Sequence, residues 1–385
     1  MKIVIASDSF KGSLNSLEVA KAIESGIKKV YPRADIIKFP IADGGEGTVQ
    51  AFISSIGGEL VTTNVTGPLG TKVTATYGIL TDKKTAVIEM AAAAGITLVP
   101  QDQLNPLITT TYGVGELIRH ALDRGCTEFI IGLGGSATND GGAGLAQALG
   151  YKLLDADDQE IAFGGGSLQN LRRIDATNVD HRIFKANFIV ASDVTNPLYG
   201  PNGATYIYGP QKGATPKMLN ELDNGLKNFA KIIYRDLKKD IHNLPAAGAA
   251  GGLGGGLFAF VNATLKRGID IIIEKANLKK YLHDADYVIT GEGKIDSQTI
   301  NGKVPVGVAK IAKEYNVPVI ALAGYVDDKS FLTHEAGIDA IFSIINYPIT
   351  VEQAMEPTTA KMFLTKNAEE IFRLIKLITD KHEDE

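Results

Sequence analysis

The sequence has few of the features that would direct it outside the cell or into a membrane. It contains a single cysteine, Cys126, which can form no internal disulfide, and we expect a buried, reduced thiol there. The apolar run at residues 1–6 is too short for a signal peptide, and no stretch approaches the roughly 18 apolar residues of a membrane span. These absences predict a cytoplasmic protein with no membrane partner.

Strong charge of one sign and the common catalytic signatures are also missing. The net charge is -5 at pH 7 and no basic stripe occurs, so nucleic acid is not expected as a partner. The chain has no cluster of His and Cys, no G-x-S-x-G nucleophile elbow and no G-x-x-x-x-G-K-[ST] phosphate loop. A kinase with this sequence would therefore lie outside the P-loop class.

Glycine, in contrast, is abundant and gathers around one stretch. The 42 glycines exceed the usual share of about 7%. Residues 129–131 read as a buried strand, and the loop after them alternates glycines with polar residues. Glycines let backbone N–H groups approach an anion, Ser136 and Thr138 add hydroxyl donors, and Asp140 could hold a divalent ion or receive a proton. The stretch therefore predicts phosphate binding.

The same stretch fits a second interpretation. Residues 132–137 satisfy G-x-G-x-x-G/A after a strand, and Asp155 ends a second apolar run about 20 residues on, as in dinucleotide-binding folds. In such a fold the helix would already include residues 139–142, where consecutive glycines cost about 1 kcal/mol each. We therefore favour a longer phosphate loop whose helix begins at about Gly142. A nicotinamide-dependent oxidoreductase stays as the alternative.

Strands and helices alternate at both ends of the chain but not in its middle. Residues 2–6 and 35–39 read as strands that lead through polar loops into helices, the first of which Ser16 can cap, and this rhythm returns after residue 287. The middle differs, because strand-like runs at 60–65, 73–79 and 86–90 are separated by turn residues and predict hairpins.

This pattern predicts an α/β protein with two domains. A discontinuous Rossmann-like parallel-sheet domain is expected over residues 1–60, 86–135 and 280–385. An inserted mixed α/β domain is expected over residues 61–85 and 136–279. In open parallel sheets the loops at the carboxyl ends of strands bind ligands, so those loops are where functional residues are sought.

Carboxylates, lysines and hydroxyls recur in these loops. The set consists of Asp8, Lys11, Asp43, Ser136, Thr138, Asp140, Asp193, Lys212, Glu292, Lys294, Asp296 and Lys303. Phosphoryl transfer needs this combination, because cations neutralise the transferring group, carboxylates hold Mg²⁺, and one carboxylate accepts the proton of the acceptor hydroxyl. The loops therefore favour a phosphotransferase.

Seven motifs along the chain resemble those of the glycerate kinase type I family. They are KIVIASDSFKGSLNSLEVA at the start, ADGGEGT at 42–48, GLGGSATNDGGAG at 132–144, SDVTNPLYGPNGA at 192–204, YGPQKGA at 208–214, GAAGGLGGG at 248–256 and GEGKIDSQTINGK at 291–303. The resemblance implies transfer of the γ-phosphate of ATP to D-glycerate with Mg²⁺, in a cleft between two α/β domains, and it favours 2-phosphoglycerate as the product.

The resemblance, with analogy to other kinases of small hydroxy acids, also suggests roles for individual side chains. Catalysis is assigned to Lys11, Asp43 and Asp193, one of the two aspartates being the base. Glycerate binding is assigned to Asp43, Glu46, Asp193, Asn196 and Lys212. ATP binding is assigned to Gly134, Gly135, Ser136, Thr138, Asn139, Lys294 and Lys303, and Mg²⁺ binding to Glu292, Asp296 and Asp140. A non-enzymatic sugar-acid-binding module is a further alternative, and a homo-oligomer is left open.

Overall fold

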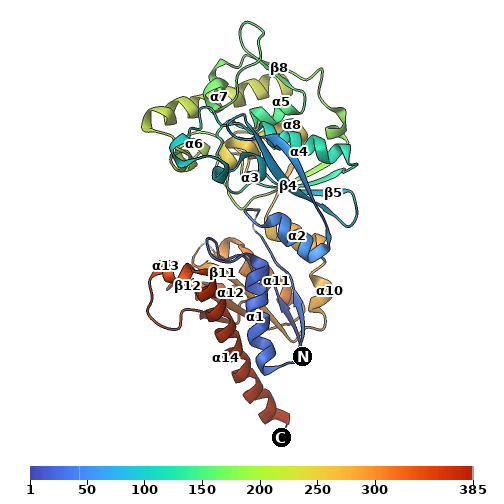
Figure 1. Cartoon of the computed structure of the whole chain (residues 1–385), viewed down its shortest axis with the longest axis vertical. Coiled ribbons are helices and arrows are strands. Elements are labelled where there is room, and N and C mark those ends of the chain that lie inside the picture. The colour runs from blue at the N-terminus through green and yellow to red at the C-terminus, as the bar shows by residue number, and fades with distance from the viewer. Residues whose placement is uncertain (43, 298, 384–385) are drawn as a thin grey trace. The chain divides into compact units, whose positions relative to one another are not determined.

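A computed structural model describes residues 1–42, 44–297 and 299–383 of the chain, which forms two compact units (Figure 1). The first unit combines Met1–Asp43, Gln50–Ile56 and Ile269–Glu385, and the second combines Gly44–Val49 and Gly57–Gly268. Each unit has its own sheet with helices packed against it. The chain is therefore a mixed α/β protein, as the alternation of strands and helices predicts.

The first unit contains a five-stranded sheet in the order β13-β12-β11-β1-β2, in which all neighbours are parallel. Its strands are β1 (Lys2–Ile5), β2 (Asp35–Lys38), β11 (Tyr287–Ile295), β12 (Val319–Val326) and β13 (Ala340–Ser343). The central strands are rich in buried apolar residues, as expected for a parallel sheet covered on both faces. The parallel sheet predicted from the two ends of the chain is confirmed.

Two long helices of this unit, α1 (Ser16–Val30) and α14 (Pro357–Glu383), lie side by side (Figure 1). Gly26 permits their close approach, because a Cβ at this position would lie 2.2 Å from the carbonyl oxygen of Thr365. The N-cap of α1 is Asn15 and not the expected Ser16, because Asn15 and Glu18 exchange hydrogen bonds in a capping box. The remaining helices are α9 (Gly268–Lys275), α10 (Lys279–Leu282), α11 (Val304–Glu314), α12 (Leu332–Glu335) and α13 (Val351–Met355).

The second unit contains a six-stranded mixed sheet in the order β10-β9-β6-β5-β4-β3. Strands β3 (Gly58–Thr66), β4 (Lys72–Leu80) and β5 (Thr85–Glu89) are antiparallel neighbours, which confirms the predicted hairpins. Strands β5, β6 (Glu128–Gly132), β9 (Asn187–Ala191) and β10 (Thr264–Lys266) are parallel.

Strand β5 joins the hairpin region to the parallel region, because it pairs antiparallel with β4 on one side and parallel with β6 on the other. The strands of residues 86–135 therefore belong to the sheet of the second unit. This grouping differs from the expected one, in which residues 86–135 belonged with the two ends of the chain. Periodicity identifies these strands but does not reveal which neighbours complete their hydrogen bonds.

Helices enclose the core of the second unit. They are α3 (Ala91–Ala94), α4 (Tyr112–Asp123), α5 (Ala143–Ala148), α6 (Ala204–Tyr208), α7 (Pro216–Leu237) and α8 (Leu253–Val261), with a small antiparallel pair formed by β7 (Lys152–Leu154) and β8 (Arg173–Asp175). Cys126 is 1% exposed in this core, so the expected buried thiol is confirmed. Helix α2 (Thr48–Ile56) begins in the second unit and continues in the first.

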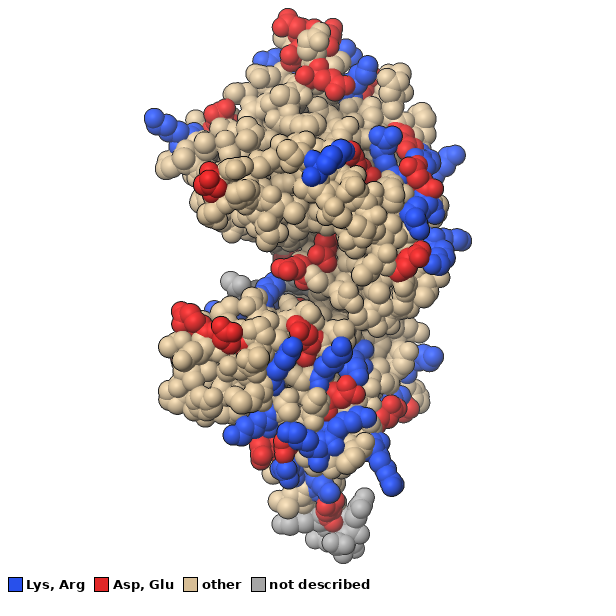
Figure 2. Space-filling model, viewed as in Figure 1, with Lys and Arg blue, Asp and Glu red and all other residues tan. Residues whose placement is uncertain are grey.

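The surface shows no concentration of one charge on the face that is visible in Figure 2, where basic and acidic side chains are interspersed. This agrees with the small net charge of -5. Across the described part of the chain, no helix has both the length and the apolar composition that crossing a membrane requires.

Candidate active site

Each unit places candidate residues at or beyond the carboxyl ends of its parallel strands, the edge at which α/β sheets bind ligands. In the second unit these residues follow β6 and β9, and in the first unit they follow β1 or lie on and beyond β11. The two groups are therefore distinct clusters, each built by its own sheet.

The glycine-rich stretch of the second unit leaves β6 as an irregular loop. Helix α5 begins at Ala143, directly after Gly142, which has a φ of 85°. The delayed helix is therefore confirmed, and the start before Asn139 that the dinucleotide interpretation requires is wrong. Asp155 accepts hydrogen bonds from the N–H groups of residues 157 and 159 in a turn, and β7 before it pairs with β8 and lies outside the six-stranded sheet. The oxidoreductase alternative requires an early helix after β6 and an acidic residue at the end of the next strand of the same sheet. The structure has neither feature at these positions.

Several glycines of this stretch approach another part of the chain. A Cβ on Gly132 would lie 2.5 Å from the Gly44 carbonyl oxygen, and a Cβ on Gly134 would lie 2.5 Å from the Cα of Gly45. The Gly134 N–H donates to the Gly44 oxygen at 3.1 Å, and the Gly135 oxygen accepts from the N–H of Ile96 at 2.8 Å. The glycines therefore do allow a close approach to the backbone, as predicted. At Gly134, however, the group that approaches is the protein segment 44–45.

Lys212 is the buried cation of the second cluster. It is only 1% exposed, and its Nζ donates to the Ser136 hydroxyl and to the Thr138 carbonyl oxygen, both at 2.7 Å. Burial lowers the pKa of Lys212 to about 7, although the nearby Asp140 carboxylate favours the charged form. The described residues provide Lys212 with no ion-pair partner within 4.0 Å, so a further anion would stabilise the ammonium group.

Thr138 and Asn139 present unused polar atoms close to this lysine. Both residues are fully buried, and Thr138 Oγ1 and Asn139 Oδ1 have no hydrogen-bond partner within the described chain. The Asn139 amide is held by donating to the hydroxyl of Thr205, on α6, at 2.9 Å. Buried polar atoms usually have partners, so these two point to a ligand or water.

Asp140 has a different environment from a typical metal ligand. It is fully buried, and its carboxylate accepts hydrogen bonds from the Thr111 N–H and hydroxyl at 2.8 Å each, from Gly142 N–H at 3.1 Å and from Gly144 N–H at 3.2 Å. Burial raises the pKa of Asp140, while these hydrogen bonds favour its ionised form. The arrangement anchors the loop to the start of α5.

The other predicted residues of the second unit lie on exposed or half-buried loops. Asp193 is exposed after β9, and Glu46 is exposed in the segment before α2. The side chain of Asn196 is fixed by the protein, because its Oδ1 accepts from the Tyr208 hydroxyl and its Nδ2 donates to the Asn202 oxygen, both at 2.8 Å. Asp43 lies outside the described residues.

The first unit brings Glu292, Asp296, Lys294 and Lys303 together. The Lys303 ammonium lies 3.8 Å from one oxygen of each carboxylate, and the exposed Lys294 lies 3.1 Å from Asp296 Oδ2. Strand β11 extends to Ile295, so the expected loop at 291–295 is a strand instead. The reason is its pairing with β12, which continues through Lys294 and Ile295.

Glu292 is the buried member of this first cluster, being 7% exposed. Burial raises its pKa, although the Thr299 hydroxyl, which donates to Oε1 at 2.6 Å, and the charges of Lys303 and Lys11 favour the ionised form. Lys11 is exposed on the loop after β1. The cluster thus combines two carboxylates with three lysines at the carboxyl edge of β11 and β1.

Three polar residues on or just beyond these strands were not identified as site residues from the sequence. Ser7, two residues beyond the end of β1, and Thr290, within the adjacent strand β11, are fully buried, and their hydroxyls have no partner among the described residues. Glu89, the last residue of β5, accepts a hydrogen bond from Val49 N–H at 2.8 Å. A polar residue at or just after the end of an apolar strand was a usable signal for Ser7 and Glu89.

Two α/β units with lysine, carboxylate and hydroxyl groups at the carboxyl ends of their parallel strands are the framework of an α/β enzyme that acts on small anionic molecules. The profile of the glycerate kinase family matches residues 3–376. The chain belongs to the glycerate kinase family.

Known proteins resemble the chain over nearly its whole length. A glycerate 2-kinase of Escherichia coli (strain K12) is 54% identical over 354 residues, which cover 92% of this chain and 93% of that protein. A glycerate kinase of Bacillus subtilis (strain 168) is 52% identical over 377 residues, which cover 98% of each chain. A crystal structure assigned as glycerate kinase 2 of Salmonella typhimurium LT2 superposes with a TM-score of 0.88 at 51% identity, over 99% of each chain.

Proposed function

We propose that this chain transfers the γ-phosphate of ATP to a hydroxyl of D-glycerate, releasing ADP and phosphoglycerate. The observation that carries the proposal is the family match over residues 3–376, together with relatives named glycerate kinase at 54% and 52% identity. The 2-hydroxyl is the favoured acceptor, because the motifs favour it and one relative is named a glycerate 2-kinase.

The direct test is an assay with purified protein, D-glycerate and Mg-ATP. We expect stoichiometric release of ADP, and phosphorus NMR of the product distinguishes 2-phosphoglycerate from 3-phosphoglycerate. The absence of turnover with glycerate and related hydroxy acids would sink the kinase proposal. Glycerate binding without ATP turnover would favour a binding module.

In the proposed mechanism, the cluster around Lys212 binds an anionic group of a substrate. The Lys212 ammonium group donates to the carbonyl oxygen of Thr138. Thr138 carries one unpartnered atom, its hydroxyl oxygen, and the next residue, Asn139, carries the other, its amide oxygen. The Thr138 hydroxyl and the ammonium group can donate to a carboxylate or a phosphate. Lys212 would hold either the glycerate carboxylate or the ATP phosphates, with Ser136 orienting its Nζ.

We assign the divalent ion to the two carboxylates of the first unit, Glu292 and Asp296, with the remaining ligands left to phosphate oxygens and water. Glu292 Oε2 and Asp296 Oδ1 each lie 3.8 Å from the same Lys303 ammonium, so both oxygens face one cationic position. Carboxylate oxygens are the ligands Mg²⁺ prefers, and the ion when bound would neutralise charge on the β- and γ-phosphates. Lys303, Lys294 and Lys11 would bind phosphate oxygens next to it. We leave Asp140 out of this site because the protein already occupies its carboxylate.

Glu292→Gln is expected to raise the Mg²⁺ concentration needed for half-maximal activity by at least about tenfold, since weakened metal coordination typically costs 10- to 100-fold. Titration of activity with Mg²⁺ at saturating ATP measures this effect. Glu314→Gln is the matched control, because Glu314 forms an ion pair with Lys279 elsewhere on the same unit. An unchanged Mg²⁺ requirement in Glu292→Gln would exclude Glu292 as a ligand.

Asp193 is the proposed base that accepts the proton of the glycerate hydroxyl. Asp193→Asn is expected to lower kcat by about 10²- to 10⁴-fold, the usual contribution of general base catalysis. The side chain is exposed, so the urea midpoint of unfolding should stay unchanged. Asp157→Asn, at an exposed turn, is the control. An Asp193→Asn enzyme with near wild-type kcat would leave Asp43 as the candidate base.

A further inference from the structure

The segment 44–49 lies across the ends of three neighbouring strands of the second unit. The Gly44 oxygen accepts from Gly134 N–H at 3.1 Å just beyond β6. A Cβ on Gly44 would lie 2.4 Å from the oxygen of Ala191, the last residue of β9. Glu89, the last residue of β5, accepts from Val49 N–H at 2.8 Å. The segment is therefore fixed at both of its ends.

The hydrogen bond to Glu89 replaces a local helix cap. Helix α2 begins at Thr48, and the residue before it is Gly47, which has no side chain to accept from the first N–H groups. The Thr48 hydroxyl donates to the Gly45 oxygen at 2.7 Å, so this hydroxyl contributes to the turn. A carboxylate 40 residues along the chain therefore stabilises the start of α2, where negative charge is favourable.

The Glu89 carboxylate also lies close to the exposed Glu46. Burial raises the pKa of Glu89, backbone N–H groups of residues 47–49 lower it, and the negative charge of Glu46 raises it again. The negative charges of Glu46, in segment 44–49, and of Glu89, at the end of β5, therefore influence each other. Glu46 is exposed, whereas Glu89 accepts a hydrogen bond from the backbone of the same segment.

We propose that Glu89 is a positioning residue for glycerate: its carboxylate fixes segment 44–49 on the sheet edge and thereby places the Glu46 carboxylate for binding the glycerate hydroxyls. This inference rests on the proposed function and on the assignment of Glu46 to glycerate that the family resemblance of the sequence suggests. Glu89 acts through the N–H groups of the segment, so its loss should impair glycerate binding more than ATP binding.

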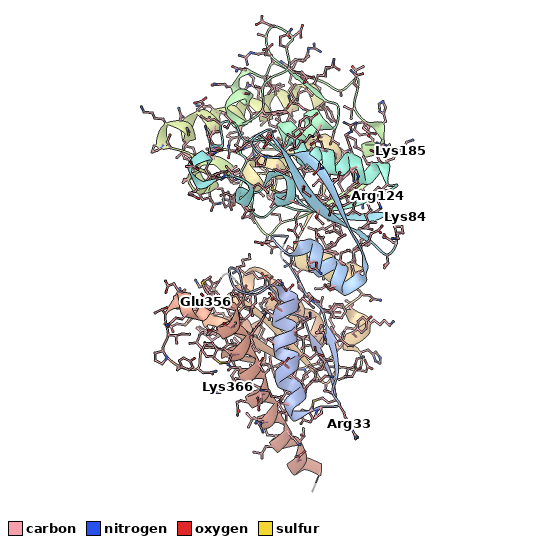
Figure 3. The ribbon with its side chains drawn as sticks, in the orientation of Figure 1. Arg33, Lys84, Arg124, Lys185, Glu356 and Lys366 are labelled. Atoms are coloured by element: carbon pink, nitrogen blue, oxygen red, sulfur yellow. The ribbon has the colours of Figure 1, made fainter. Side chains whose placement is uncertain are left out.

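The test compares Glu89→Ala and Glu89→Gln with Glu128→Gln. Glu128 is a matched control, because it begins β6 at the opposite edge of the same sheet, next to Lys84, and accepts from Asn187 Nδ2 at 3.0 Å. Figure 3 labels Lys84 and Arg124, which lie at this amino-terminal edge. The Glu128→Gln substitution therefore removes a carboxylate from the same sheet without affecting segment 44–49.

We expect Glu89→Ala to raise the KM and the calorimetric Kd for glycerate at least tenfold while the KM for ATP stays within twofold. Glu89→Gln keeps an oxygen acceptor and should recover part of the glycerate affinity, and Glu128→Gln should match the wild type. Hydrogen exchange of the Val49 amide should accelerate in Glu89→Ala.

Equal increases in both KM values, or unchanged glycerate affinity with faster Val49 exchange, would overturn the proposal and leave Glu89 as a structural cap. Glycerate binding is measured by calorimetry as well as by turnover. A wild-type protein that binds glycerate but has no ATP turnover would therefore contradict the proposed kinase function, while the binding data would still decide the role of Glu89. A wild-type protein that binds no glycerate would overturn both.

Discussion

Lys212→Met is expected to lower kcat/KM by about 100- to 1,000-fold, the usual effect of removing one preorganised donor to an anionic group in a closed site. Methionine fills a similar volume but has no charge and cannot donate to Ser136 or Thr138. The substrate whose anion the lysine binds is identified by which KM rises, glycerate or ATP. Activity within about threefold of wild type would exclude Lys212 from the anion site.

The same variant should be more stable than the wild type at neutral pH. The pKa of Lys212 is about 7 in the folded protein and 10.5 without burial, so the unfolded chain binds more protons between these values. Wild-type stability should therefore rise with pH across this window, and burial penalises the charged form fully below pH 7. Lys212→Met should lose this dependence. If Lys212→Met is more stable but less active than the wild type, the Lys212 charge serves the reaction. If the variant is both less stable and less active, the charge serves to hold the fold together.

Lys212 should also set the alkaline limit of activity. Its ammonium group is protonated below its pKa of about 7, so kcat/KM should fall as pH rises through this value. Lys212→Arg keeps its charge at every relevant pH, and its residual kcat/KM should show no such fall. An alkaline limb that persists unchanged in Lys212→Arg would assign the titration to another group.

Asp140→Ala is expected to destabilise the protein by about 3–5 kcal/mol, the range seen when one partner of a buried charged interaction is removed. Four donors from Thr111, Gly142 and Gly144 would lose their acceptor. Urea unfolding measures the loss, and Asp140→Asn should be intermediate because its amide oxygen can still accept. The predicted metal role of Asp140 would instead give unchanged stability and a raised Mg²⁺ requirement.

The sequence was informative where the signal is local. Alternating or continuous apolar runs identified the parallel strands at both ends and the hairpins of β3 to β5, because these patterns follow from which face of each strand is buried. The delayed start of α5 was also predictable, since adjacent glycines disfavour a helix. The polar residues around Lys212 were singled out one by one from the sequence, but their contacts with each other were not predicted.

The features of the fold and the site that the sequence did not predict depend on contacts between residues far apart in the chain. Residues 291–295 contain two glycines and read as a loop, yet pairing with β12 holds them in a strand. The sequence could not tell why residue 134 is a glycine. A ligand close to the backbone would exclude a side chain there, and so does Gly45, which is the neighbour in the structure. The position of Glu89 at the end of a strand is visible in the sequence, but its contact with the Val49 N–H is not, because 40 residues separate the two.

The division of the chain between the two units also sets the order in which they can be completed on the ribosome. Strand β1 ends at Ile5, but its neighbour β11 begins at Tyr287, after every residue of the second unit has been made. At about 5–20 residues per second, synthesis of the intervening chain takes on the order of 15–60 s. Throughout that time the apolar strand β1 has no β11 to pair with, so the first sheet is completed only after translation has passed the second unit.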